Sequence, residues 1–137
     1  MSKLGTIVKT ASGVIATTIA LFTALRENPQ ISAGIDDALA KLKEAARSDK
    51  PKTRFEAKLA AIEAAADAVD QTFPDATEPD GWRRQTRALR VRGDLAWNAN
   101  TGAPRRRALK ALNAETAEIL THVNTRLVEL QALPGHE

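Results

Sequence analysis

The sequence has no cysteine and no tyrosine, and aromatic residues make up only 4% of its 137 residues. Without cysteine the chain forms no disulfide bond, no thiolate metal site and no cysteine nucleophile. Alanine supplies much of the 43% apolar content. Buried apolar area stabilises a fold by about 25 cal/mol per Å², and the single methyl group of alanine buries little area. We therefore expect one domain with a thin core, and a homo-oligomer in which a second chain completes the burial of the alanine-rich helices.

Long hydrophobic runs are also missing. The sixteen residues from Thr10 to Leu25 carry no charge, but they include four threonines, one serine and one glycine. A membrane-spanning helix needs roughly 20 predominantly apolar residues. The stretch therefore predicts no membrane span, and it lacks the dense apolar block of a signal peptide.

The apolar residues that are present recur at intervals of three and four, and no segment alternates in the manner of a half-buried strand. Prolines mark most of the helix boundaries, with Asp80 expected as the cap of the fourth helix and Pro104 as the start of the fifth. The pattern predicts an all-α chain of five helices, near residues 3–26, 29–47, 51–73, 81–97 and 104–133.

Short connections favour antiparallel neighbours, so we expect the third, fourth and fifth helices to form an up-down-up antiparallel bundle. The chain divides into an amphipathic N-terminal helix, residues 1–27, and a helical bundle domain, residues 28–137. Trp82 and Trp97 lie on one face of the fourth helix with Leu89, which predicts that both rings anchor the core. Their expected partners are Phe55, Leu59, Ile62, Leu112 and Ile119.

Charge is unevenly distributed along the chain. Residues 1–80 have ten basic and twelve acidic side chains, whereas residues 81–137 have ten and five. Between Gly81 and Leu112, nine Arg or Lys residues accompany a single acid, Asp94. Some of these cations match acids at the same i, i+4, i+7 spacing on the preceding helix. In a helical hairpin they would form an exposed ladder, pairing Asp70 with Arg83, Asp67 with Arg87, and Glu63 with Arg90.

Six further cations lie outside this ladder, and we interpret them as candidate ligands for phosphate or another anion. They are Arg84, Arg92, Arg105, Arg106, Arg107 and Lys110. Residues 105–107 fall in the first turn of the fifth helix, where the helix dipole disfavours cations by roughly 0.3–1 kcal/mol but favours an anion. Arginine also matches the geometry of phosphate. A solvated run of charge without a ligand is the alternative.

The first helix has an unusual polar face, formed by Thr, Ser, Gly and Ala with one lysine and no acid before Glu27. Amphipathic helices that lie in the lipid interface have this type of composition. We therefore expect membrane contact from Lys3, Leu4, Ile7, Val8, Lys9, Ile15, Phe22 and Leu25. Two alternatives remain open: the helix packs into the core of its own chain, or its small residues admit a helix of a second copy.

The sequence lacks recognisable catalytic motifs. Its two histidines are His122 and His136, and Glu118 precedes His122 by about one helical turn. A metal site would need further ligands from another helix, and the sequence has neither a glycine-rich phosphate loop nor a nucleophile motif. We predict no enzyme, no catalytic residue, no metal and no cofactor.

These patterns favour a non-enzymatic helical adaptor or structural assembly protein that acts at an anionic membrane surface. The expected location is the cytoplasm, with peripheral attachment to the inner face of the cell membrane. The partner would be the anionic membrane or another protein. The alternative is a nucleic-acid-binding protein that uses the basic segment 82–110. It is less favoured because the two tryptophans fall on the core face and offer no stacking platform.

Overall fold

The computed structural model describes residues 11–27 and 32–131. Within these ranges the chain is helical and has no strand, which confirms the predicted all-α fold. The five helices are α2 (Ala11–Leu25), α3 (Ser32–Ala46), α4 (Pro51–Thr72), α5 (Glu78–Ala99) and α6 (Gly102–Gln131).

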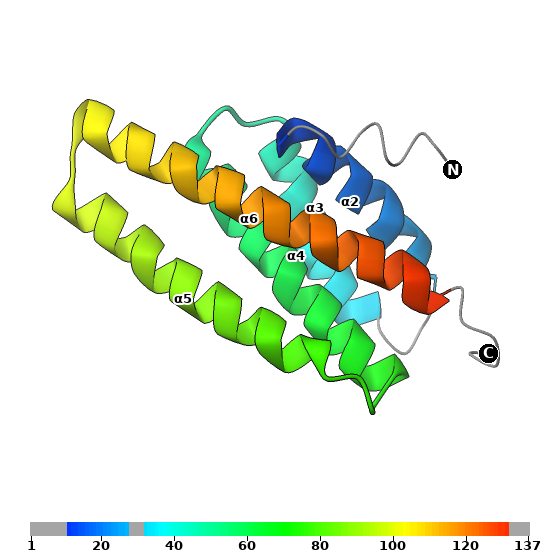
Figure 1. The fold of residues 1–137 in the computed structure, drawn as a ribbon. Helices are drawn as coiled ribbons and strands as arrows, with labels where there is room; N and C mark the ends of the chain where they lie inside the picture. The colour runs from blue at the N-terminus through cyan, green and yellow to red at the C-terminus, as the bar shows by residue number, and fades with distance from the viewer. Residues whose placement is uncertain (1–10, 28–31, 132–137) are drawn as a thin grey trace.

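Successive helices run in opposite directions, so α2, α4 and α6 point one way while α3 and α5 point the other (Figure 1). α4 packs against α3, α5 and α6, and α2 packs against α3 and α6. The predicted up-down-up arrangement of α4, α5 and α6 is therefore confirmed. As a consequence, the N-terminal ends of α2, α4 and α6 lie toward the same end of the bundle (Figure 1).

Two helices begin earlier than the sequence predicts. α5 begins at Glu78 and includes Pro79 in its first turn, whereas the sequence predicts Asp80 as its cap. Proline fits there because its missing N–H would have no helical partner, and the carboxylates of Glu78 and Asp80 favour the positive end of the helix. α6 begins at Gly102 rather than Pro104, and the φ of 58° at Gly102 is one that glycine adopts without strain.

The buried apolar side chains form two clusters. The larger draws mainly on α2, α3, α4 and the C-terminal half of α6, and it includes Phe22, Leu42 and Ile62. The smaller joins the N-terminal half of α4 to α5 and to the N-terminal half of α6, through residues such as Phe55 and Leu112. The core therefore continues across the domain boundary predicted at residue 27.

α2 buries the apolar arc that the sequence indicates against α3 and α6. Ile15 and Phe22 are 1% and 0% exposed, and this burial corrects the membrane contact expected for these two side chains. Leu25 is half-buried and packs against the larger cluster. The other residues expected to contact a membrane lie outside the described residues: Lys3, Leu4, Ile7, Val8 and Lys9.

A buried polar contact sets the register of α2 on α6. Asn124 Nδ2 donates to Thr18 Oγ1 over 2.7 Å, and Thr18 Oγ1 donates to the Val14 carbonyl over 2.6 Å. Thr18 and Asn124 are both buried. A buried polar group that loses its partner costs about 1–3 kcal/mol, so sliding α2 along α6 would be unfavourable.

The two tryptophans occupy different positions relative to the core. Trp82 is 4% exposed within the larger cluster, as predicted. Trp97 is half-buried against the smaller cluster, and cations cover its ring. Lys52 Nζ lies 4.5 Å and Arg105 Cζ 3.9 Å from the ring centroid. Both indole rings are therefore used within the chain.

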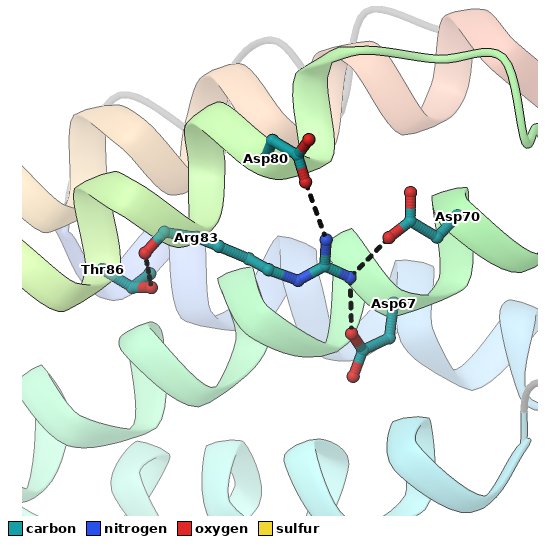
Figure 2. Close-up of polar contacts among 5 residues, drawn as sticks. All are labelled: Asp67, Asp70, Asp80, Arg83 and Thr86. Carbon is teal, nitrogen blue, oxygen red and sulfur yellow. Dashed lines mark hydrogen bonds and ion pairs between the residues drawn. The ribbon is translucent and has the colours of Figure 1, made fainter.

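The predicted ladder between α4 and α5 forms with one change of partner, and Figure 2 shows the part of it around Arg83. Arg83 Nη2 lies 2.8 Å from Asp67 Oδ1 and 2.6 Å from Asp70 Oδ2, and Arg83 Nη1 lies 3.4 Å from Asp80 Oδ1. Arg90 Nη2 and Nε donate to the two carboxylate oxygens of Glu63, over 2.7 and 3.2 Å. The pairs of Asp70 with Arg83 and of Glu63 with Arg90 are confirmed.

The predicted pairing of Asp67 with Arg87 is wrong, because Asp67 contacts Arg83 instead. Arg83 and Arg90 are seven residues apart, close to two full helical turns, so they point to the same side of α5. Arg87 is four residues after Arg83 and is rotated from it by about 40°. That rotation leaves Arg87 exposed.

Gly93→Ala is predicted to destabilise the bundle. A Cβ atom at Gly93 would lie 2.6 Å from Phe55 Cε2. Such overpacking typically costs 1–3 kcal/mol, more than the gain of up to about 1 kcal/mol from replacing a helical glycine by alanine. Chemical denaturation should show a net loss of roughly 1–2 kcal/mol. In the matched control Gly81→Ala, the new Cβ meets only Arg84 Nη2 at 3.7 Å, so stability should stay equal or rise. Equal losses in both variants would contradict the prediction.

A double-mutant cycle on Glu63→Ala and Arg90→Ala should give a coupling energy of a few tenths to about 1 kcal/mol, because the pair is bidentate but partly exposed. The corresponding cycle on Asp67→Ala and Arg87→Ala should give no coupling, since Asp67 pairs with Arg83. Urea unfolding of the single and double variants measures both. Coupling between Asp67 and Arg87, without coupling between Glu63 and Arg90, would contradict the pairing seen in the structure.

Candidate anion-binding pocket

A pocket with a volume of about 510 Å³ lies between the N-terminal halves of α4 and α6. We call it the cationic pocket, because five of its lining residues are cationic and only one, Asp49, is acidic. Its lining residues are Asp49, Pro51, Arg54, Lys58, Ala103, Arg106, Arg107, Lys110 and Asn113. A concave surface with this excess of positive charge favours a negatively charged ligand.

Helical spacing explains why these residues converge. Residues 51, 54 and 58 lie on one face of α4, and residues 103, 106, 107, 110 and 113 lie on one face of α6. Because α4 and α6 run in the same direction, the first turns of both helices border the pocket. The positive ends of both helix dipoles therefore add to the charge of the side chains.

Arg54 joins the pocket to the end of α3. Its Nη1 donates to the carbonyl oxygens of Ala45, over 3.1 Å, and Ser48, over 2.6 Å. These acceptors are neutral, so the hydrogen bonds hold the guanidinium in place without cancelling its charge. Arg54 therefore contributes a fixed positive charge to one wall of the pocket.

Lys58 is the unusual member of the set, because its side chain is 1% exposed. Its Nζ donates to Asn113 Oδ1 over 2.5 Å, and no ion pair joins Lys58 to a carboxylate in the described ranges. Burial, and then the charge of Arg54, lower the pKa of Lys58 from 10.5 to about 8. A buried ammonium group without a counter-charge destabilises a fold, and such groups are enriched in functional sites.

Asn113 holds the two walls of the pocket together. Its Nδ2 donates to the Pro51 carbonyl on α4, over 2.8 Å, and to the Leu109 carbonyl on α6, over 3.1 Å. Its Oδ1 accepts the hydrogen bond from Lys58. One amide side chain thus contacts the backbone of both helices and the buried cation, which preforms the pocket.

The remaining three cations are exposed on the α6 wall. Arg106, Arg107 and Lys110 were each predicted from the sequence as anion ligands, and the structure brings them together at the cationic pocket. Within the part of the chain that the structure describes, none of the three forms an ion pair. Their charges are therefore available to a ligand.

Arg92 and Arg84, two other predicted ligands, lie away from the pocket on α5. Arg92 forms a bidentate ion pair with Glu115, with both N–O distances 2.8 Å. The hydrogen bond to Arg92 lowers the pKa of Glu115, and the same bond raises the pKa of Arg92. The charge of Arg92 is thus largely balanced within the chain. Arg84 is exposed on α5 and does not line the cationic pocket.

Arg105, the last predicted ligand, serves the end of the preceding helix. Its Nη2 donates to the Trp97 carbonyl over 2.6 Å, and its Nε donates to the Asn100 carbonyl over 2.9 Å. Carbonyl groups at a helix C-terminus lack helical partners and favour a cation. This contact explains why an arginine is tolerated in the first turn of α6.

Sequence reasoning missed Arg54 and Lys58. Lys58 lies three residues after Phe55 and four before Ile62, on the buried arc of α4, and a lysine at a core-facing position is a signal that could have identified it. Arg54 carries no comparable signal, because its role depends on carbonyl groups of the preceding helix.

In residues 11–27 and 32–131, no group of three or more His, Asp or Glu side chains could hold a metal ion. His122 is exposed on α6, and His136 lies outside the described residues. No helix in these ranges is long and apolar enough to cross a membrane.

Comparisons with known proteins add no information on function. No protein-family model matches the chain, and no curated protein and no solved structure matches it either. The cationic pocket is therefore the feature from which a function can be inferred.

Lys58→Met is predicted to stabilise the protein at neutral pH. Folding lowers the pKa of Lys58 from 10.5 to about 8, so the unfolded chain binds this proton more tightly. The free energy of unfolding of the wild type should therefore rise as the pH increases from about 8 to 10.5. Methionine has no charge to desolvate, and we expect a gain of about 1–3 kcal/mol at neutral pH that shrinks in alkaline buffer.

Urea unfolding in neutral and alkaline buffer measures both effects. Lys43→Met is the matched control, because Lys43 is an exposed lysine on α3 and its replacement makes the same change of side chain without removing a buried charge. A loss of stability in Lys58→Met that is the same in both buffers would contradict the prediction.

Proposed function

We propose that the protein is a non-enzymatic helical adaptor or assembly protein that docks on an anionic membrane surface. The observation that carries this proposal is the cationic pocket, where five cations meet a single acid. Three of these cations, Arg106, Arg107 and Lys110, are exposed and have no ion-pair partner in the described ranges. Such a group of positive charges attracts the negatively charged phosphates of lipid headgroups.

The magnitude of this attraction indicates that a second contribution is needed. Each Lys or Arg close to an anionic surface contributes about 1 kcal/mol, so the three exposed cations supply about 3 kcal/mol, and stable attachment takes an additional hydrophobic signal. Residues 1–10 precede α2, which begins toward the same end of the bundle as α4 and α6 (Figure 1). They include Leu4, Ile7 and Val8 beside Lys3 and Lys9. We assign the hydrophobic contribution to these three apolar residues.

Nucleic-acid binding is the weaker candidate. Arg83, Arg90 and Arg92 form ion pairs within the chain, and Arg105 binds backbone carbonyls. The two indole rings are packed or covered by cations. What remains is a compact group of charges, whereas single-strand binding needs a basic track with aromatic stacking platforms and duplex binding needs contacts to many phosphates.

Self-association and a protein partner stay predictions. The large apolar side chains that are exposed in the described ranges are Val91 and Leu95 on α5 and Val128 on α6. Val91 and Leu95 are one turn apart, and two such side chains are far fewer than the roughly 20–30 residues a side of a standard interface. Location at the inner face of the cell membrane likewise stays part of the proposal.

Vesicle flotation tests the proposed function. The intact protein should float with vesicles that contain anionic lipid and stay in the soluble fraction with neutral vesicles. The triple variant Arg106→Gln, Arg107→Gln, Lys110→Gln loses about 3 kcal/mol of attraction, so its partition coefficient should fall roughly 100-fold. The matched control Arg84→Gln, Arg87→Gln, Lys43→Gln removes three exposed cations elsewhere and should float almost as well as the wild type.

Two further outcomes would contradict the proposal. An equal loss of flotation in both triple variants would mean that net charge, rather than the cationic pocket, drives attachment. No flotation of the wild type, together with salt-sensitive retention of DNA or RNA in a filter assay, would favour the nucleic-acid alternative.

A further inference from the structure

We propose that the cationic pocket binds a phosphomonoester group, with Lys58 as the buried ligand and Arg106, Arg107 and Lys110 as the outer ligands. The proposal deepens the proposed function and takes its biological setting from it. It names the ligand as the terminal phosphate of a lipid headgroup or of a soluble phosphorylated compound, since the two present the same group to the pocket. The residues that would bind the phosphate are described residues of α4 and α6.

The balance of charge selects the ligand class. Five cations and one carboxylate line the pocket, so a single negative charge leaves most of the excess uncompensated. A phosphomonoester carries about −1.5 to −2 at neutral pH, whereas a phosphodiester or a carboxylate carries −1. A dianionic group therefore satisfies the pocket better than the phosphodiester of a nucleic-acid backbone does.

Cationic side chains line the pocket from two helices, which suits a group with several acceptor oxygens. Lys58 and Arg54 approach from α4, and Arg106, Arg107 and Lys110 approach from α6. A phosphomonoester exposes three strong acceptor oxygens that can be shared between two such walls, whereas a diester has two. The first turns of both helices add backbone dipoles of the same sign.

Lys58 is an independent observation that points to a ligand, because it is buried with a single hydrogen-bond partner. An ammonium group has three N–H donors, and the structure gives one of them a partner, Asn113 Oδ1. The side chain is 1% exposed, so it is shielded from bulk water although it lines the pocket. A phosphate oxygen at this position would provide both a hydrogen-bond acceptor and the counter-charge that no described carboxylate provides.

The size of the pocket suits a small group. A volume of about 510 Å³ falls in the range of small-molecule sites. It accommodates a phosphate with a sugar-sized or glycerol-sized neighbour. The exposed α6 wall leaves the pocket accessible from solvent or from a surface that carries the phosphate.

Chemical-shift titration of the intact, isotopically labelled protein tests the proposal. The probes are inorganic phosphate and glycerol 3-phosphate, with dimethyl phosphate as the diester control, all at constant ionic strength and near neutral pH. Both phosphate probes should shift the backbone amides around Lys58 and Arg107 in a saturable manner, and the diester should bind about tenfold more weakly or worse. Equal binding of monoester and diester would overturn the proposal.

Variants identify the ligands. Lys58→Met and Arg107→Gln should each weaken binding of inorganic phosphate about tenfold or more, which is the effect of losing one charged hydrogen bond. Arg107 is exposed, so its replacement tests the pocket even if Lys58→Met alters the fold. The matched control Arg84→Gln, an exposed arginine on α5, should bind like the wild type. Equal weakening in the control, or unchanged binding in both pocket variants, would overturn the proposal.

Lipid vesicles separate this proposal from the proposed function. Preferential flotation with phosphatidic acid, a monoester, over phosphatidylglycerol, a diester, would support both. Saturable phosphate binding without flotation on any vesicle would support a pocket for soluble monoesters and overturn the membrane function. Flotation that is equal on the two lipids, without a response to inorganic phosphate, would overturn the pocket assignment and leave the membrane function standing.

Discussion

The parallel packing of α4 against α6 is the constraint on which the rest of the structure depends. α5 returns the chain along the bundle, so α4 and α6 begin at the same end (Figure 1), and Asn113 joins them through the Pro51 carbonyl and Lys58. This contact places the first turn of α4 beside the N-terminal half of α6. A chain with the same helices but an antiparallel α4 and α6 would separate the five cations of the pocket to opposite ends.

Two arginines make this concentration of positive charge tolerable. Arg54 is the fourth residue of α4 and Arg105 the fourth residue of α6. Each donates to carbonyl oxygens at the end of the preceding helix, Arg54 to Ala45 and Arg105 to Trp97. The unfavourable interaction of each cation with its own helix is thus offset by the negative end of the helix before it. Arg106 and Arg107 have no such compensation, and for this reason we assign them to a ligand.

The alanine content of α4 has a consequence within the single chain. Much of the alanine in α4 is buried within the single chain, including Ala61, Ala65 and Ala66. Small side chains let α3, α5 and α6 approach α4 from several sides, and Gly93 extends the same close approach to the ring of Phe55. Alanine here allows α4 to occupy the centre of the bundle, and its burial does not require a second copy.

The sequence by itself determined the helices, the antiparallel order of α4, α5 and α6 and two of three ladder pairs, because helical period, proline and charge spacing are local properties. It also included Arg106, Arg107 and Lys110 among six candidate anion ligands, and these three line the cationic pocket. Only the tertiary structure decided that the apolar arc of α2 faces the core, that Arg92 pairs with Glu115, and that Lys58 is buried beside Arg54. These facts depend on which helices are neighbours and on the rotation of each about its axis, and neither is encoded in a local pattern.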